Sequence, residues 1–183
     1  MRLCDCPDQV IEVRCCARNR HLSLRSKYPM PKEIERKFLT TSQLWKENVS
    51  RAIVMKQGYL NGNPDRTVRV RVAGEKGWLT VKGRNVGLTR LEFEYEIPVG
   101  EAMEMLKLCE QPIIEKTRYL VVEYGKTWEV DVFSGVNEGL TVAEIELETE
   151  EEAFTLPDWV GEEVSADPRY YNVSLIRSPF SEW

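Results

Sequence analysis

Residues 33–38 read EIERKF, and this short stretch decides how the chain folds. Every second position is ionisable, namely Glu33, Glu35 and Lys37. Successive side chains of a β-strand point to opposite faces, so the alternation predicts a strand with one charged face. Burying three ionisable groups together costs free energy unless they are paired or hold a ligand. The surroundings of this face therefore determine what the protein does.

Seven further segments alternate in the same way, and turn signals such as NGNPD (61–65) and GRNVG (83–87) separate many of them. The eight expected strands span 33–38, 53–60, 67–72, 78–83, 90–97, 115–124, 127–135 and 140–148. Eight antiparallel strands at this spacing predict a mainly β fold (α+β), either a closed barrel or a sandwich.

Helical segments are expected to be few. One is expected after Thr41 or Ser42, through residues 43–46, and one within residues 99–112. Thr149 precedes three glutamates, which is typical of a helix start. Residues 157–183 are expected to form a loop and a short helix.

The charged faces of the expected strands separate by sign. Arg69 and Arg71 share one face within 67–72, whereas Glu144 and Glu146 share one within 140–148. A solvated sheet face predicts mixed polar side chains rather than this separation. We therefore expect the charged faces to point into a closed eight-stranded barrel, with the apolar faces packed against a few helices outside.

A cavity of this kind suits a metal-bound polyphosphate. Clustered carboxylates hold hard divalent cations, and clustered Arg and Lys side chains hold phosphate oxygens. Phosphoryl transfer depends mostly on positioning and on charge stabilisation. A catalytic cysteine–histidine pair is not needed, and the single histidine, His21, lies in the N-terminal segment.

The EIERK stretch resembles the E-x-E-x-K signature of the CYTH family, the triphosphate tunnel metalloenzymes. Further matching motifs follow in the family's order: QGYL (57–60), RVR (69–71), TVKG (80–83), RLEFE (90–94), EKTRY (115–119), WEVDVF (128–133), AEIEL (143–147) and GEEVSADPRYYN (161–172). The resemblance covers about residues 31–177. It implies a closed antiparallel eight-stranded barrel around a charged tunnel, which acts on a small-molecule triphosphate with Mg²⁺ or Mn²⁺.

The resemblance also implies roles for individual residues. The metal side consists of Glu33, Glu35, Asp131, Glu144 and Glu146, and the triphosphate cradle consists of Lys37, Arg69, Arg71, Lys82, Lys116 and Arg118. Lys37 matches the signature lysine that contacts the phosphate and helps to orient or activate the attacking water. A base role would require a depressed pKa, because an ordinary lysine is protonated at neutral pH.

Other charged residues are assigned supporting roles or none. Glu92 and Glu94 are expected to pair with the bases, and Glu129 could serve either side. The roles of several further residues stay open: Arg84, Arg90, Arg169 and Tyr170.

The motif pattern is similar to that of the small bacterial inorganic triphosphatases, which implies hydrolysis of tripolyphosphate. Thiamine triphosphatase is an alternative that needs an aromatic platform, for which Trp45, Trp78 and Trp159 are available. Class IV-type adenylate cyclase acting on ATP is another alternative. A non-catalytic module that binds polyphosphate or nucleotides is the non-enzyme alternative.

Composition limits the partners. The formal net charge of −5 argues against a nucleic-acid partner, which favours basic proteins. No apolar run is long enough to span a bilayer, and no secretory signal is present. We therefore expect a cytoplasmic monomer or homodimer.

Residues 1–29 differ from the rest of the chain. They are basic and hold four cysteines, Cys4, Cys6, Cys15 and Cys16, at spacings that match zinc sites poorly. We expect a disordered extension or a start that truly falls at Met30, followed by one tunnel domain over 30–183. The remaining cysteine, Cys109, is expected to be a small apolar residue on a helix.

Overall fold

The computed structural model describes residues 32–63, 65–84, 86 and 89–183. The extension predicted for 1–29, with its four cysteines and His21, lies outside the described residues. All eight predicted strands are present: β1 (Lys32–Thr40), β2 (Val49–Asn63), β3 (Arg66–Ala73), β4 (Lys76–Gly83), β5 (Thr89–Ile97), β6 (Ile114–Glu123), β7 (Lys126–Ser134) and β8 (Thr141–Glu146).

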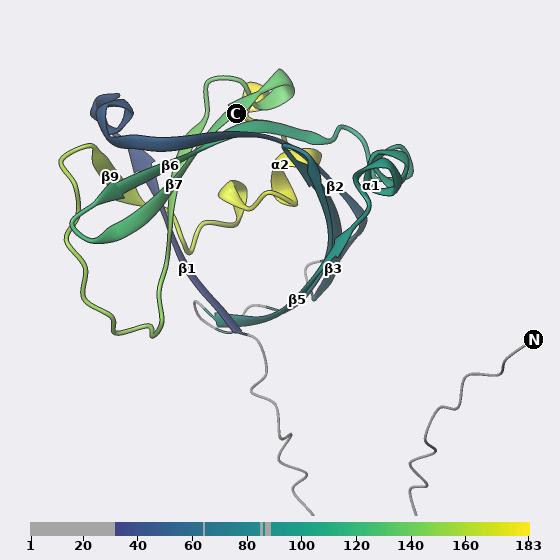
Figure 1. Ribbon diagram of the computed structural model, residues 1–183, viewed down its shortest axis with the longest axis horizontal. Coiled ribbons are helices and arrows are strands. Elements are labelled where there is room, and N and C mark those ends of the chain that lie inside the picture. The colour runs from purple at the N-terminus through teal and green to yellow at the C-terminus, as the bar shows by residue number, and fades with distance from the viewer. Residues whose placement is uncertain (1–31, 64, 85, 87–88) are drawn as a thin grey trace, which may run out of the picture.

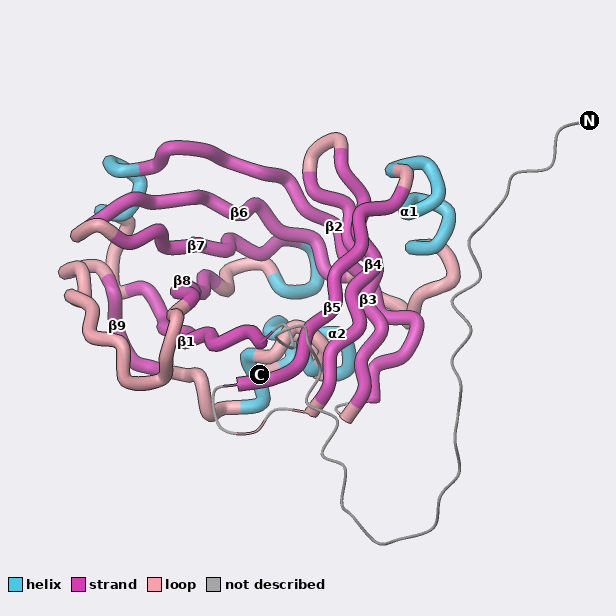
Figure 2. Tube along the Cα trace, turned by 60° about the horizontal axis from the view of Figure 1, so that its bottom comes forward, coloured by secondary structure: helices cyan, strands magenta, loops and turns pink. Residues whose placement is uncertain are grey.

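These eight strands close into an antiparallel barrel, so the barrel is confirmed over the sandwich. The strand order is β5-β4-β3-β2-β6-β7-β8-β1, and β1 pairs with β5 to complete the ring (Figure 1). The closing contact is short and places Glu33 opposite Arg90. Figure 2 shows β6, β7, β8 and β1 on one side of the ring and β2 to β5 on the other.

A ninth strand, β9 (Val160–Glu163), extends the sheet beyond the barrel. It pairs with the later part of β1, at Phe38 and Thr40, whereas the first part of β1 pairs with β5. β1 therefore divides its pairing between the barrel and an outer strand. The expectation of a loop for this part of the chain was wrong.

The outward faces of the strands form the hydrophobic core, as the alternation predicts. One cluster lies outside β1, β6, β7 and β8 and contains Phe38, Trp128 and Ile145, each at most 2% exposed. A second lies where α1 (Val99–Leu106) packs against β3 and β4. Figure 2 shows α1 on the outside of that side of the barrel. Cys109 belongs to this second cluster but lies just beyond the helix.

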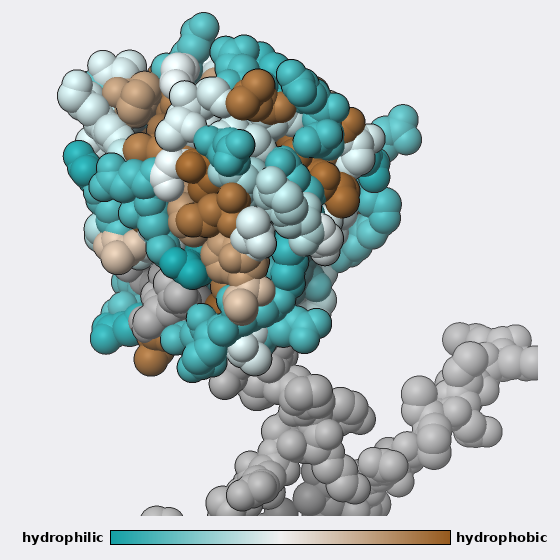
Figure 3. Space-filling model, turned by 90° about the vertical axis from the view of Figure 1, so that its left-hand side faces the viewer, coloured by the Kyte–Doolittle hydropathy of each residue, from teal (hydrophilic) through white to brown (hydrophobic). Residues whose placement is uncertain are grey.

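The helix predicted to start at Thr149 is absent. Residues 149–152 form a turn, in which the Glu152 N–H donates to the Thr149 carbonyl at 3.2 Å. Phe154 then packs edge-on against Trp128, with ring centroids 5.9 Å apart, and this contact draws the segment across the outer face. Figure 3 shows this side of the molecule, where hydrophobic side chains gather near the middle of the face and hydrophilic ones surround them.

One end of the barrel is closed by α2 (Ser174–Arg177). Leu175 and Ile176 are buried against inward-facing apolar side chains of β2, β6, β7 and β8, namely Tyr59, Ile114, Phe133 and Val142. In Figure 1 the C-terminal segment accordingly lies across the opening of the ring. Shorter 3₁₀ helices occur at Leu44–Asn48, Gly135–Asn137, Pro168–Tyr170 and Phe180–Glu182. No helix in the described part of the chain has the length and apolar character needed to cross a membrane.

Candidate functional site

The interior of the barrel holds two adjoining chambers. The larger, about 450 Å³, we call the large chamber, and the smaller, about 210 Å³, the small chamber. All the predicted site residues except Asp131 line the large chamber: Glu33, Glu35, Lys37, Arg69, Arg71, Lys82, Glu92, Glu94, Lys116, Arg118, Glu129, Glu144 and Glu146. The period of two therefore predicted correctly which side chains share the interior.

The strand register of β1 and β8 places opposite charges together. Lys37 lies opposite Glu144, and Glu35 lies opposite Glu146. The Lys37 ammonium contacts Glu144 and also Glu35, which is two positions away on the same face. The signature lysine is thus held between two carboxylates from neighbouring strands.

Asp131 lies behind the bases rather than on the chamber wall. It is fully buried, and its two oxygens accept hydrogen bonds from Arg118 at 2.7 and 2.8 Å. The Lys116 ammonium contacts it as well. Because both Asp131 oxygens already contact basic side chains, Asp131 is better placed to fix Arg118 and Lys116 in position than to bind a metal.

On β3 to β5, a carboxylate joins two arginines. The Glu94 carboxylate accepts two hydrogen bonds from Arg71 at 2.9 Å and one from Arg69 at 3.2 Å. Arg69 also donates to the Thr80 hydroxyl at 3.2 Å, and Arg71 lies over the Trp78 ring at 5.0 Å. Glu94 therefore holds the arginines side by side, as its expected supporting role requires.

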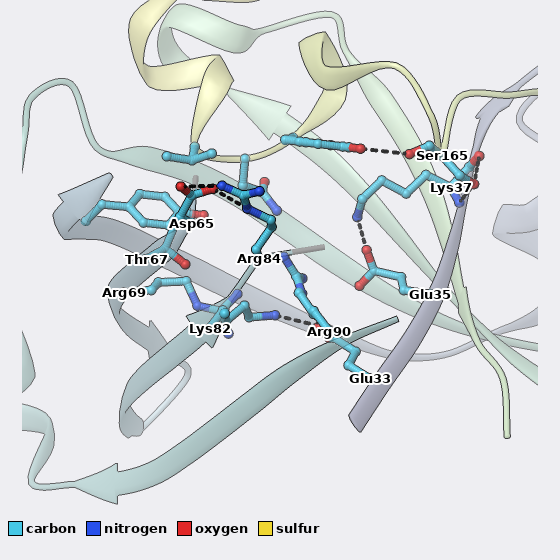
Figure 4. A pocket seen from close by; sticks show the side chains of 15 residues that line it. Glu33, Glu35, Lys37, Asp65, Thr67, Arg69, Lys82, Arg84, Arg90 and Ser165 are labelled. Atoms are coloured by element: carbon cyan, nitrogen blue, oxygen red, sulfur yellow. Dashed lines mark hydrogen bonds and ion pairs between the residues drawn. The ribbon is translucent and has the colours of Figure 1, made fainter. Parts of the chain in front are cut away.

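Glu33 and Glu92 form a second mixed cluster where β1 meets β5. The Lys82 ammonium lies 2.8 Å from Glu33 and 2.6 Å from Glu92, and Arg90 donates to Glu33 at 2.8 Å. Figure 4 shows Lys82 and Arg90 beside Glu33 from the small chamber. Arg90 lines both chambers and so belongs to the tunnel.

The other residues of open role lie differently. Arg84 faces the small chamber, where it pairs with Asp65 at 2.7 Å and stays largely exposed. Arg169 pairs with Asp167 at 2.6 Å and lies over Trp183, away from both chambers. Tyr170 packs against the apolar cluster beneath α2.

Charge and burial shift the pKa values of these groups. Burial acts against the charge of Lys37, but the charges of Glu144 and Glu35 outweigh it and raise the Lys37 pKa above its ordinary value. Lys37 is therefore a cation at neutral pH rather than a proton acceptor. Burial, together with the hydrogen bond to Glu33, raises the Glu92 pKa to about 7.

The carboxylates have the chemistry that a hard divalent cation requires. Glu146 makes no ion pair with any residue that the structure describes, and burial and the charges of Glu33 and Glu35 raise its pKa. This mutual repulsion is what a bound cation would relieve. As the described side chains stand, no three carboxylates, thiols or imidazoles converge on one point. Metal binding there therefore requires carboxylates to turn away from their basic partners.

Sequence reasoning missed several polar residues of the tunnel. Applying the period of two to IVMKQGYL would have placed Gln57 and Tyr59 inside, where they line the large and the small chamber. Ser165 of the C-terminal motif was also missed and lines the small chamber, whereas Asn172, for which that motif predicts a structural or gating role, lines both chambers. The Ser165 hydroxyl accepts a hydrogen bond from the Lys37 backbone N–H at 2.9 Å and so holds β1 in place.

Comparisons with known proteins agree with this geometry. A family model described as the CYTH domain matches residues 31–177. An inorganic triphosphatase of Acetivibrio thermocellus is 52% identical over 155 residues, which cover 84% of this chain and 99% of that protein. An inorganic triphosphatase of Nitrosomonas europaea is 37% identical over 150 residues, which cover 80% and 97%. The crystal structure of the inorganic triphosphatase NE1496 aligns with a TM-score of 0.58 and 34% identity, over 79% of this chain and 93% of that one.

Proposed function

This chain belongs to the CYTH domain family, and from that premise we propose that it is an inorganic triphosphatase that hydrolyses tripolyphosphate with a divalent metal, Mg²⁺ or Mn²⁺. The observation that carries the proposal is the ring of bases that lines the large chamber: Lys37, Arg69, Arg71, Lys82, Arg90, Lys116 and Arg118. Such a ring suits several phosphate groups at once, since guanidinium and ammonium groups bind phosphate oxygens strongly.

Charge balance supports a requirement for metal. Seven carboxylates line the large chamber beside the seven bases: Glu33, Glu35, Glu92, Glu94, Glu129, Glu144 and Glu146. As far as the described residues line it, the chamber is therefore formally neutral and offers no surplus positive charge for a polyanion. A divalent cation would supply that charge and, when bound, would polarise the phosphate oxygens and neutralise charge that develops in the transition state.

Substrate binding then takes the form of an exchange of ion-pair partners. We assign the cradle to Lys37, Arg69, Arg71, Lys82, Lys116 and Arg118, with Arg90 added because it lines both chambers. The phosphate oxygens would take the place of Glu33, Glu35 and Glu144 on the bases that these carboxylates hold. The released carboxylates, together with Glu146, which has no ion-pair partner among the described residues, would then supply the oxygen donors for the metal. Asp131, Glu92, Glu94 and Glu129 hold the bases in register.

Lys37 is assigned the catalytic role. Its raised pKa keeps the ammonium protonated, so it donates hydrogen bonds to the phosphate and orients the attacking water. In this ligand-free arrangement it does not accept the proton of the water.

The location of the tryptophans argues against an organic group on the substrate. Trp45 and Trp159 are buried in the outer hydrophobic cluster and cannot form a platform in the tunnel. Trp78 faces inward but already lies against Arg71. Tripolyphosphate therefore fits better than thiamine triphosphate or ATP.

The test is phosphate release from tripolyphosphate, thiamine triphosphate and ATP in EDTA, Mg²⁺ and Mn²⁺, with cyclic AMP measured alongside. We expect strong metal-dependent release from tripolyphosphate and little from ATP. Cyclic AMP and pyrophosphate from ATP would identify a cyclase instead. Binding of tripolyphosphate without turnover would identify a binding module and overturn the proposal.

The remaining assignments are proposals from composition. We propose a single tunnel domain over residues 30–183, a monomer or homodimer, and a cytoplasmic location without a nucleic-acid partner.

A further inference from the structure

A buried amide in the wall of the large chamber is left without a partner. Gln57 on β2 is 1% exposed, lines this chamber, and its Nε2 atom has no hydrogen-bond partner among the described residues. Most buried polar groups in folded proteins are hydrogen-bonded, because an unpaired one keeps the cost of its desolvation. The Gln57 amide therefore has an N–H donor for which the described part of the chain provides no acceptor.

The neighbours of Gln57 are the bases assigned to the phosphate cradle. In the strand register Gln57 lies opposite Arg71 on β3. Two positions along on the same face, Tyr59 lies opposite Arg69, and Met55 lies opposite Lys116 on β6. Diagonal neighbours on one face of a sheet are within reach of long side chains. Gln57 is thus surrounded by three cations that attract phosphate oxygens.

Gln57 also differs from these cations. Arg71 is paired with Glu94 and Lys116 with Asp131, so each must release or share a carboxylate before it binds phosphate. The amide carries no charge, and no carboxylate of the described residues is hydrogen-bonded to its Nε2 atom. A phosphate oxygen can accept its N–H without the breaking of an ion pair.

We infer that Gln57 is a further substrate-binding residue, whose amide donates a hydrogen bond to a phosphate oxygen held between Arg71 and Lys116. The inference rests on the proposed function and deepens it. It also assigns a role to the QGYL motif, which contains no charged residue and has no part in the assignments above. Since the amide contacts the phosphate chain and carries no proton to or from the reacting atoms, its loss should affect binding more than the chemical step.

The first test is Gln57→Met, which keeps the length of the side chain and removes both N–H donors. The ligand-free protein should be at least as stable as the wild type, because an unpaired buried amide is lost. The KM for tripolyphosphate at saturating Mg²⁺ should rise about tenfold to a hundredfold, which is the worth of a hydrogen bond to a charged group, while kcat changes by less than about threefold. Gln43→Met, at an exposed glutamine outside the tunnel, is the matched control and should change neither value.

A second variant keeps the inference testable if Gln57→Met does not fold. Gln57→Glu preserves shape and polarity but has no N–H and adds a negative charge beside the phosphate, so its KM should rise at least as much. A wild-type KM in either folded variant overturns the inference, and so does a lowered melting temperature with unchanged KM, which marks a purely structural amide. If the wild type itself fails to hydrolyse tripolyphosphate, the proposed function is overturned, and this inference falls with it.

Discussion

Lys37 and Glu144 lie directly opposite each other in the β1–β8 pair, and the Lys37 ammonium contacts the Glu144 carboxylate inside the barrel. Glu144 also accepts a hydrogen bond from Arg118 at 2.6 Å, so one carboxylate joins β1 to β6. Burial and the neighbouring bases act on Glu144 in opposite directions, and the bases prevail, so its pKa lies well below the ordinary value. The pair is therefore charged on both sides throughout the neutral range.

Lys37→Ala should lose most turnover and keep the fold. The ammonium that contacts the phosphate is removed, and losses of about a hundredfold or more in kcat are typical when such a donor is deleted. Glu144 retains Arg118 as a partner, so the barrel should stay folded. Phosphate release and circular dichroism check the two effects.

The control is Lys56→Ala, which removes another lysine of a strand ion pair. Lys56 is half-exposed and pairs with Glu115 on the outer face. Such pairs contribute little to stability, so turnover should be unchanged. Near-normal turnover of Lys37→Ala would show that the assigned role is wrong.

Glu35→Gln should weaken metal dependence. Glu35 lies opposite Glu146 and near Glu33, and its replacement removes one charged oxygen donor from the proposed metal side. The half-saturating Mg²⁺ concentration should rise about tenfold or more. Glu96→Gln, at an exposed Lys76 partner, is the control. An unchanged metal titration for Glu35→Gln would place the metal elsewhere.

The set of side chains that face the barrel interior was predictable from the sequence, because it depends only on the alternation of charged and apolar residues along each strand. A period of two sorts side chains into two faces without knowledge of the strand order, and this was enough to bring Glu33, Arg69 and Arg118 into one chamber. The prediction that the charged faces point into the barrel rather than outward followed from the separation of acidic and basic side chains between strands.

The pairing of individual charges was not predictable, because it depends on register and closure. Glu33 contacts Arg90 only because β1 closes on β5, and Asp131 is buried behind Arg118 only because β6 and β7 pair in one register. β9 and the turn at Thr149 were missed for a similar reason. Phe154 and Trp159 pack onto Trp128, and this tertiary contact outweighs the local helix signal.

Gly58→Ala should destabilise the barrel. An added Cβ at Gly58 would lie 2.6 Å from the Cys109 Cβ and 2.9 Å from its Sγ, so the turn after α1 would have to move away from β2. Overpacking of this kind costs about 1–3 kcal/mol, which urea denaturation can measure. Gly100→Ala is the control, because a Cβ there meets no atom within 4 Å. Equal midpoints for the two variants would contradict the close contact.

A chain that starts at Met30 should retain full turnover. The described interior residues begin at Glu33, and within the described part of the chain the tunnel side chains are held by strand residues of the barrel itself. We expect the same kcat and KM for tripolyphosphate as in the full chain. Loss of activity on truncation would assign a function to residues 1–29.

Glu92 should make the protein less stable as the pH rises toward neutrality. Its pKa is about 7 in the folded protein and 4.5 ordinarily, because of burial and Glu33, so the folded state binds its proton more tightly than the unfolded chain does. This stabilisation is fully present below about pH 4.5 and is lost as the pH rises through about 7. The Glu33 pKa is lowered in the folded protein, so ionised Glu33 stabilises the fold above its ordinary pKa of 4.5. This stabilisation is lost only when the pH falls below that value, and Glu33 therefore does not affect the change in stability as the pH rises toward neutrality.

The measurement is the melting temperature in EDTA between about pH 5 and pH 8 for the wild type and for Glu92→Gln. The wild-type value should fall across this range, and the variant, which has no proton to lose at this position, should fall less. Some slope should remain, because burial also raises the pKa values of Glu129 and Glu146. Identical slopes would show that the Glu92 pKa is not raised inside the barrel.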